Sequence, residues 1–510
     1  MRAGLVRTRT NATLAASGVL LVWLLVSVDG PRAAAQPAPL EPREQTAVQI
    51  AIDRGVQYLQ RSQNPGGSWG TGTGIGSGGG WAVGYTALAG LTLVECGVPT
   101  TDPGLKKAAR IVRDGARQPK FDSTYEVALA ILFLDRMGDP NDRRLIQTLA
   151  VRLIAGQSQS GGWAYKVPLP GDAETNQILA ALRKLNTSRA SGLSFRERPS
   201  SVGLCIKMSD DIRPRPSSSG PGSVAEAEDP KKAEAAVIGS LPPGIRRMNI
   251  FQDPDRLNMQ DPEGKGQEAF NGTTDNSNTH FATLGLWAAR RHDVPTERTY
   301  SLLVRRFRTS QNPDGTWAYA YANGGKGGGA GAMTGVALLV LAIGHVLGVD
   351  EGAPAKLEQD PQVLNGLKAL SGRVGAPVGE FQNRPAPKDI GGLYFMWAME
   401  RIAVLYDLRT LGNKDWYRWG MEILVAHQQA DGSWLEGGYP GQHPVVNTCL
   451  ALMFLKRANL TPDLSRRLTV DAAALAEQPA PAPQGVPFVI PNLSSTPEAP
   501  KAEEPAPTPT

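Results

Sequence analysis

Four short segments with one shared spacing decide the fold class of this 510-residue chain. They are Gln63–Trp69 (QNPGGSW), Gln157–Trp163 (QSQSGGW), Gln311–Trp317 (QNPDGTW) and Gln428–Trp434 (QQADGSW). Four matches at a fixed spacing indicate a repeated structural unit. Glycine can end a helix in the left-handed conformation, glutamine can bond free backbone groups, and tryptophan can bury a large ring between repeats. We therefore expect a structural role for Gln63, Trp69, Gln157, Trp163, Gln311, Trp317, Gln428 and Trp434.

The helices predicted around these segments fall into two kinds. Each segment ends a polar helical stretch and leads, through a glycine-rich loop, to a helix that is apolar on nearly every side. A helix without a polar face should be buried. The apolar helices are expected at 82–96, 124–137, 277–290, 333–347, 392–406 and 446–456, with 176–185 as a seventh. Alternating outer and inner helices predict an all-α chain, an α/α toroid of six to seven helix pairs around a central cavity.

The first 35 residues have the pattern of an export signal. Arg2, Arg7 and Arg9 precede an apolar run over 12–28, and Ala33–Ala35 offers small residues for cleavage. The pattern predicts a mature chain that begins at Gln36, is secreted or periplasmic, and has no membrane span. The alternative is an uncleaved N-terminal anchor.

Low-complexity segments interrupt and follow the repeats. A proline-rich and serine-rich stretch over 189–272 is expected to be a flexible insertion, and 479–510 is expected to be an extended Pro/Ala-rich tail. The toroid is thereby divided into a first half at 43–188 and a second half at 273–470.

The formal charge of +5 falls to +2 once the four arginines and one aspartate of the leader are removed. A near-neutral chain gives no support to nucleic-acid binding.

The four segments resemble the QW motifs of the squalene cyclase and prenyltransferase repeat family. The resemblance covers about residues 43–470 and implies a terpenoid cyclase-like α/α toroid. It does not fix the function, because terpene cyclases, prenyltransferase subunits and complement-type thioester domains share this ring.

The chemistry of that family is largely missing from the sequence. Squalene-cyclising members use an Asp-x-Asp-Asp acid, which this chain lacks; the nearest match, Met208–Asp211, has no first aspartate. The prenyltransferases bind zinc, but Cys96, Cys205 and Cys449 have no His or Cys at ligand spacing. We therefore expect no metal and no cofactor.

Candidate functional residues gather where the inner helices begin. Asp275 and Asn278 can either cap a helix or line the mouth of the cavity. Asp172 and Asn176 are expected to match them, as is Asn447 in the last repeat. His280, one turn further, would face Asp275 or the lumen. The tyrosines expected at the same mouth are Tyr165, Tyr319 and Tyr321.

Two acids lie inside apolar helices. A buried carboxylate is costly unless it has a partner, so Glu126 and Glu400 should either face the lumen or be paired. Together with His280 and Asp275 they are the candidates for a catalytic role.

Three functions remain open. The first is an exported toroid that binds an apolar or glycan ligand, or a partner, in its central cavity without cyclase chemistry. The second is a terpene cyclase-type enzyme with a non-standard acid. The third is a carbohydrate-active toroid enzyme, which would use paired carboxylates and aromatic platforms.

Overall fold

The structure, a computed structural model, describes residues 39–70, 82–192, 230–253, 257, 274–321, 328–378, 385–437 and 442–476. Its longer helices are α1 (Pro42–Arg61), α2 (Ala82–Glu95), α3 (Pro103–Ala116), α4 (Thr124–Met137), α5 (Arg143–Ala155), α6 (Asp172–Gly192), α7 (Pro230–Gly239), α9 (Asn276–Ala289), α10 (Glu297–Ser310), α11 (Gly331–Leu347), α12 (Pro361–Ser371), α13 (Gly392–Leu405), α14 (Trp416–His427) and α15 (Pro444–Lys456). Shorter ones are α8 (Pro243–Arg246), α16 (Pro462–Arg467) and α17 (Ala472–Ala476). The strands are β1 (Trp317–Ala318) and β2 (Gly329–Ala330), which pair antiparallel.

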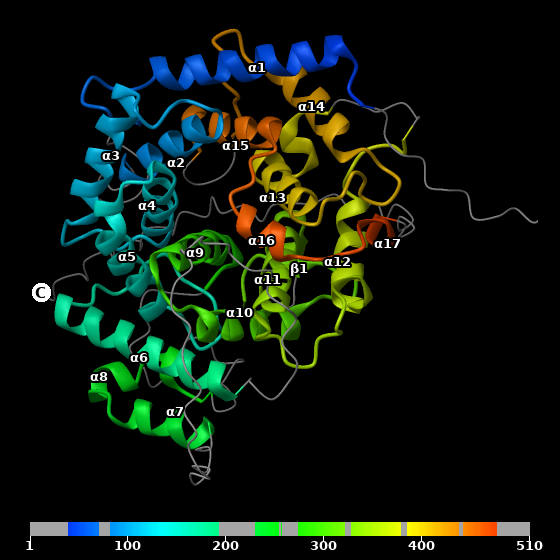
Figure 1. Cartoon of the computed structure of the whole chain (residues 1–510). Helices are drawn as coiled ribbons and strands as arrows, with labels where there is room; N and C mark the ends of the chain where they lie inside the picture. The colour runs from blue at the N-terminus through cyan, green and yellow to red at the C-terminus, as the bar shows by residue number, and fades with distance from the viewer. Residues whose placement is uncertain are drawn as a thin grey trace, which may run out of the picture. The chain divides into compact units, whose positions relative to one another are not determined.

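Six helices form a closed inner ring. The contacts run from α2 to α4, α9, α11, α13 and α15, and α15 returns to α2 (Figure 1). These are the helices without a polar face; in α11, every residue from Gly331 to Gly344 is buried. Such a helix is stable only when it is surrounded by protein. The predicted all-α toroid is therefore confirmed, with six helix pairs.

The outer helices are amphipathic and precede the inner ones in the chain. They are α1, α3, α5, α10, α12 and α14. In α3 the buried residues Leu105, Ala108, Ala109, Val112 and Ala116 lie on one stripe, as expected for a helix that covers a core on one side only. Each outer helix thus shields the apolar ring from water.

The glutamine of each motif joins two neighbouring outer helices. Gln157 Nε2 donates to Gly161 O in its own turn (2.9 Å) and to Thr299 O in α10 (3.0 Å). Gly161 has a φ of 79°, and a Cβ there would lie 2.3 Å from Leu302 O, so only glycine fits this approach. The other three glutamines bond their own turn in the same way and reach the next outer helix at Gly104 O, Gln362 O and Ala51 O.

The tryptophan of each motif ties its outer helix to the following inner helix. Trp163 Nε1 donates to Leu153 O in α5 (2.7 Å), and its backbone N donates to Thr279 Oγ1 in α9 (3.2 Å). Trp69, Trp317 and Trp434 make the same two bonds, and all four rings are fully buried. Each motif therefore holds three helices together through backbone groups that would otherwise lack partners.

The seventh inner helix that we expected is not part of the ring. Helix α6 covers that stretch, but it contacts α5 and α7 and lies beyond the outer layer (Figure 1). Its apolar residues, among them Ile178 and Leu182, are buried while Asp172, Asn176 and Gln177 are exposed. One buried side is the pattern of a surface helix, which explains the wrong assignment to the interior.

Part of the expected insertion is also helical. Within 189–272 the structure describes 230–253 and 257, where α7, α8 and a short 3-10 turn at Asn249–Phe251 occur. Leu241, Ile245, Ile250 and Phe251 are buried, and the 3-10 turn packs on α5 and α10. The stretch that we expected to be a flexible insertion thus includes a helical part at 230–253, because these apolar residues have a core to join. The leader and the tail at 479–510 lie outside the described residues. In the described part of the chain, no helix has the length and apolarity needed to cross a bilayer.

Candidate functional site

Aromatic side chains from three inner helices meet inside the ring. The ring of Phe281 (α9) lies 5.1 Å from that of Tyr125 (α4), 6.3 Å from Tyr394 and 5.6 Å from Trp397 (both α13). Helices α9 and α13 are separated by α11 in the ring, so these contacts extend across its interior. We call Tyr125, His280, Phe281, Tyr394 and Trp397 the aromatic layer. The layer lies within the first two turns of these inner helices, close to the mouth of the ring.

A chain of polar groups connects this layer. Tyr125 Oη and Ser277 Oγ are 2.8 Å apart, Ser277 Oγ is 3.4 Å from Tyr394 Oη, and His280 Nδ1 is 2.8 Å from Tyr394 Oη. Burial lowers the pKa of His280 well below its usual range, and the nearby Arg401 lowers it further. His280 is therefore a neutral imidazole at pH 7 that is buried and bonds Tyr394, whereas Asp275 bonds the backbone of α9.

Two of the three predicted tyrosines form a rim above the aromatic layer. Tyr165 is 46% exposed and Tyr319 is 45% exposed, and their side chains are hydrogen-bonded to each other. The ring of Tyr165 lies 6.0 Å from that of Tyr125, which connects the rim to the layer. Exposed aromatic rings with hydroxyl groups beside buried ones suit a ligand that is partly apolar.

Tyr321 does not belong to the rim, contrary to our expectation. It is buried, and the Arg306 guanidinium lies 4.2 Å from the centroid of its ring. Arg306 also donates to Asn276 Oδ1 (2.8 Å) and Ser160 Oγ (2.7 Å). This group fills the wall between α10 and α9, so Tyr321 helps to bury a cation rather than to bind a ligand.

Asp275 caps helix α9, and Asn278 in the first turn of that helix bonds to it. The Asp275 carboxylate accepts hydrogen bonds from the backbone N–H groups of Ser277 and Asn278 and from Asn278 Nδ2 (2.7 Å). Asp172 and Asn176, their expected counterparts, are exposed on α6, which packs on α5 and α7 and not in the inner ring. The shared sequence pattern thus reflects two helix starts, only one of which is in the ring.

Glu126 lies at the interface between two inner helices. It is buried at the start of α4, and its Oε1 accepts from the backbone N–H of Gly84 in the first turn of α2 (2.9 Å). Burial raises the pKa of Glu126 to about 7, although the Gly84 bond opposes the shift. At neutral pH the carboxyl is therefore partly protonated, which is a property of general acids.

Glu400 and Arg401 are both buried near the far end of α13. Neither oxygen of Glu400 has a hydrogen-bond partner among the described residues, and the same holds for Nε and Nη1 of Arg401. Burial raises the pKa of Glu400 well above its usual range and lowers the pKa of Arg401 to about 10. Burial thus disfavours the charged form of both groups, while their mutual attraction opposes this shift in each.

Asn447 lines a separate pocket of about 590 Å³ beside the start of α15. Its Nδ2 donates to Glu436 O, and the Glu436 carboxylate accepts from Leu393 N at the start of α13 (2.7 Å). His443, which caps α15 and stacks on Tyr85, lines the same pocket. The polar groups of this pocket thus serve mainly to hold the starts of α13 and α15.

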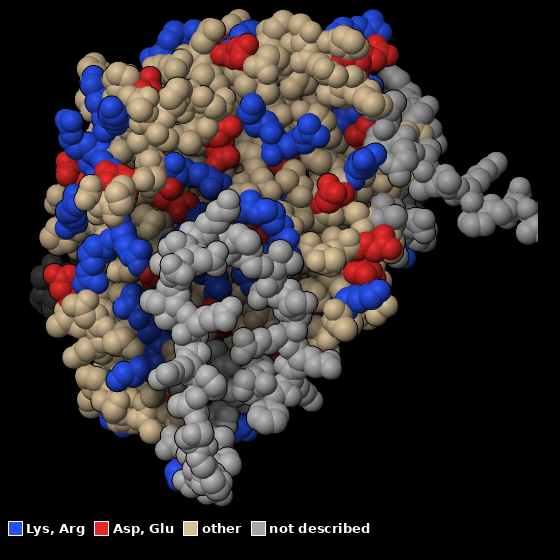
Figure 2. All heavy atoms as spheres, in the orientation of Figure 1, with Lys and Arg blue, Asp and Glu red and all other residues tan. Residues whose placement is uncertain are grey.

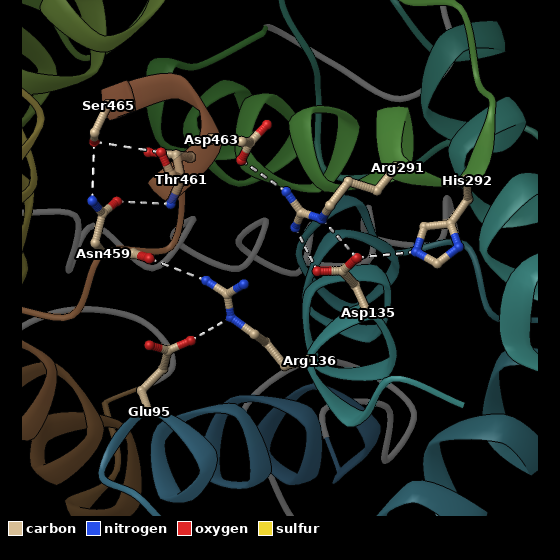
Figure 3. Close-up of polar contacts among 9 residues, drawn as sticks. All are labelled: Glu95, Asp135, Arg136, Arg291, His292, Asn459, Thr461, Asp463 and Ser465. Carbon is tan, nitrogen blue, oxygen red and sulfur yellow. Dashed lines mark hydrogen bonds and ion pairs between the residues drawn. The ribbon is translucent and has the colours of Figure 1, made fainter. Parts of the chain in front are cut away.

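Ion pairs bridge the inner helices at the end of the ring opposite the mouth (Figure 3). Arg136 (α4) donates to Glu95 (α2) at 2.5 Å and to Asn459 O at 3.1 Å. Arg291 bonds both Asp135 and Asp463, and His292 bonds Asp135. Asn459 and Asp463 lie in the segment after α15, which includes α16 and contacts α11 and α13. This segment therefore covers the far end of the ring and is fixed there by charge.

Sequence reasoning missed the residues that make up most of the aromatic layer. Tyr125 stands directly before the candidate Glu126, and Tyr394 and Trp397 belong to the run Tyr394–Trp397 (YFMW). Aromatic residues at the start of an apolar helix were a usable signal for these positions.

Among the described residues, no group of three potential metal ligands comes together.

The described part of the face in Figure 2 shows acidic side chains among the basic ones. It has no continuous basic surface of the kind that binds a phosphate backbone.

No family model matches the chain, and no curated protein matches it. The solved structures that match include three forms of the type II terpene cyclase MstE from Scytonema. One is bound to geranylgeranyl dihydroxybenzoate as substrate (12% identity, TM-score 0.44, 84% of this chain and 100% of that one), and one to merosterolic acid A as product (13%, 0.44, 82% and 99%). The third is an apo variant (12%, 0.31, 83% and 100%). The ring assignment itself rests on the helix contacts of this chain.

Proposed function

We propose that this chain is an exported α/α-toroid protein that binds a largely apolar ligand inside its ring without cyclase chemistry. The aromatic layer is the observation that supports this proposal most directly. Its rings come from α4, α9 and α13 and meet across the interior, with three hydroxyl groups and one neutral imidazole between them. Such a surface favours an apolar body with a few hydrogen-bonding groups.

Binding of defined probes to the mature chain from Gln36 tests the proposal. Geranylgeraniol represents an apolar ligand and cellohexaose a glycan, with tryptophan fluorescence as the readout. Tyr394→Ala should weaken geranylgeraniol binding about tenfold, because it removes a ring and a hydroxyl from the layer; tenfold corresponds to about 1.4 kcal/mol. Tyr58→Ala, which alters a half-buried tyrosine on outer helix α1, is the matched control. Binding of cellohexaose alone would favour the carbohydrate alternative.

The export part of the proposal has its own test. The N-terminal peptide of the protein recovered from its native compartment should begin at Gln36. An intact Met1 peptide in the membrane fraction would support the anchored alternative instead.

A cyclase-type enzyme is the second candidate, and the shifted pKa of Glu126 is the observation that favours it. The carboxyl is buried, partly protonated at pH 7 and close to the start of two inner helices. However, Glu126 already accepts a helix-capping bond from Gly84, and no second carboxylate is bonded to it among the described residues. Incubation with squalene should therefore yield no cyclic product by mass spectrometry. Turnover that disappears in Glu126→Gln or Glu400→Gln would make this candidate the better one.

A further inference from the structure

The pocket beside the start of α15 is a cavity separate from the aromatic layer. Its volume of about 590 Å³ lies within the range of about 300–1,000 Å³ that is usual for small-molecule sites. Its walls are the 3-10 turn before α13 (Pro387–Ile390), the end of α14, the loop that follows the fourth motif and the start of α15. No member of the aromatic layer lines it, so a ligand in this pocket does not share a site with a ligand of the ring.

Two histidines in this pocket have complementary hydrogen-bonding states. His427 Nδ1 lies 2.9 Å from Ile423 O, and a carbonyl only accepts, so Nδ1 holds the proton and Nε2 of the neutral ring is an acceptor. His443 Nδ1 accepts from the Val445 backbone N–H (3.2 Å), so the proton of this ring is on Nε2, which is a donor. Burial also lowers the pKa of His443, which favours the neutral ring. The pocket therefore offers one imidazole acceptor and one imidazole donor.

One negative and one positive side chain line the same pocket without pairing to each other. Glu436 Oε2 accepts from Leu393 N, and Oε1 has no hydrogen bond among the described residues. Burial raises the pKa of Glu436, while the bond from Leu393 opposes this shift by favouring the charged form. Lys388 is exposed and makes no hydrogen bond or ion pair within the part of the chain that the structure describes. Both charges can therefore still meet a ligand.

We propose that this pocket binds a free α-amino acid with an apolar side chain. Glu436 Oε1 and His427 Nε2 are the acceptors for its ammonium group. Lys388 and His443 Nε2 are the donors for its carboxylate. Apolar lining for its side chain comes from Ala386, Pro387, Leu435 and Pro444. The inference concerns a second site and does not depend on the ligand of the ring.

The two charges distinguish a zwitterion from other ligands of similar size. A phosphate or sulfate ion would place like charge beside Glu436, which is unfavourable. A neutral sugar would form no bond in which both partners are charged. A zwitterion uses both Glu436 and Lys388, and hydrogen bonds to charged groups are roughly twice as strong as those between neutral ones.

Three probes that differ in one end group test the proposal on the chain from residue 36 onward. L-leucine has both charges, N-acetyl-L-leucine lacks the ammonium group, and L-leucinamide lacks the carboxylate. Isothermal titration calorimetry should show binding of one L-leucine per chain. Each of the other two probes should bind about tenfold more weakly, because each loses one charge-assisted contact.

Two conservative variants should each remove one of these preferences. Glu436→Gln keeps an acceptor for Leu393 N and should abolish the preference for L-leucine over N-acetyl-L-leucine only. Lys388→Gln should abolish the preference for L-leucine over L-leucinamide only. The matched controls are Glu422→Gln on α14 and Lys368→Gln on α12, which do not line the pocket and should keep both preferences.

The remaining outcomes overturn the proposal. It fails if the wild-type chain binds no L-leucine, if it binds the three probes equally, or if it binds cellobiose in place of L-leucine. It also fails if saturation with geranylgeraniol displaces L-leucine, since the two would then share a site. If either pocket variant does not fold, the comparison of the three probes on the wild-type chain still decides. Binding of L-leucine without binding of geranylgeraniol supports this inference and contradicts the proposed ring ligand.

Discussion

The six seams between neighbouring outer helices are closed in two different ways. Four seams carry the motif, in which a neutral glutamine amide bonds the backbone of the next outer helix and a tryptophan fills the space behind it. The other two use a cation. In the α3–α5 seam, Arg152 donates to Ala116 O and Phe121 O. In the α12–α14 seam, Lys414 donates to Ser371 O (2.8 Å) and Val374 O (3.0 Å).

Both solutions meet the same physical need. The last carbonyl groups of a helix have no partner within it, and a buried helix end must find one elsewhere. A positive charge is favourable at this end because of the helix dipole. An amide has the different advantage that it carries no charge that must lose its water when it is buried. Only Gln157 of the four motif glutamines is buried and the other three are half-buried, so burial does not separate the two kinds of seam. The comparison teaches that a seam can be closed without the motif, and therefore that counting motifs undercounts the hairpins.

Removing the ring from a motif seam should have the largest effect. Trp317→Ala should lower the free energy of unfolding by about 3–5 kcal/mol, because it leaves a large cavity and a free Phe307 carbonyl. Thermal and urea unfolding of the chain from residue 36 onward measure the change.

A pair of conservative variants isolates the indole hydrogen bond. Trp317→Phe should be more destabilising than Trp287→Phe, because Trp287 is equally buried but its Nε1 has no partner among the described residues. Equal losses would mean that the motif tryptophans contribute through volume alone.

Loss of the amide should have an intermediate effect. Gln157→Leu keeps the volume and removes both bonds to Gly161 O and Thr299 O in a buried seam. Unsatisfied buried carbonyls cost about 1–3 kcal/mol, so the melting temperature should drop clearly. Gln147→Leu on α5, whose amide donates a single bond to His292 O, is the control and should lose less. A drop of the same size in both variants would contradict the special role of the motif amide.

The sequence predicts the ring well and the site only in part, for one physical reason. Periodicity shows which helices are buried, and the motif shows how they pair. A helix that is apolar on every side, however, does not reveal which residues face the lumen. Tyr394 and Trp397 were therefore missed, while Asp275 was found because capping is local in sequence. Helix α6 was misplaced because a stripe buried by α5 and α7 resembles one buried by the ring.

Loss of a cation from a seam without the motif should have the smallest effect. Lys414→Met removes the bonds to Ser371 O and Val374 O, but Lys414 is half-buried, so water can replace the ammonium group at these carbonyls. We expect a loss of about 1 kcal/mol at pH 7, less than for Gln157→Leu. Lys368→Met on the exposed surface of α12 is the control and should be neutral.

Burial lowers the pKa of Lys414 below its usual 10.5. Between the pKa of Lys414 in the folded chain and 10.5, Lys414 is deprotonated in the folded chain but still protonated in the unfolded chain. The wild-type free energy of unfolding should therefore rise with pH in this window, just below 10.5. The wild-type chain should therefore gain stability relative to Lys414→Met between pH 8 and pH 10.5 in parallel urea titrations. A gap that instead shrinks over this range would show that the charged bonds to the carbonyls outweigh the cost of burial, and that this seam is as strongly closed as the motif seams.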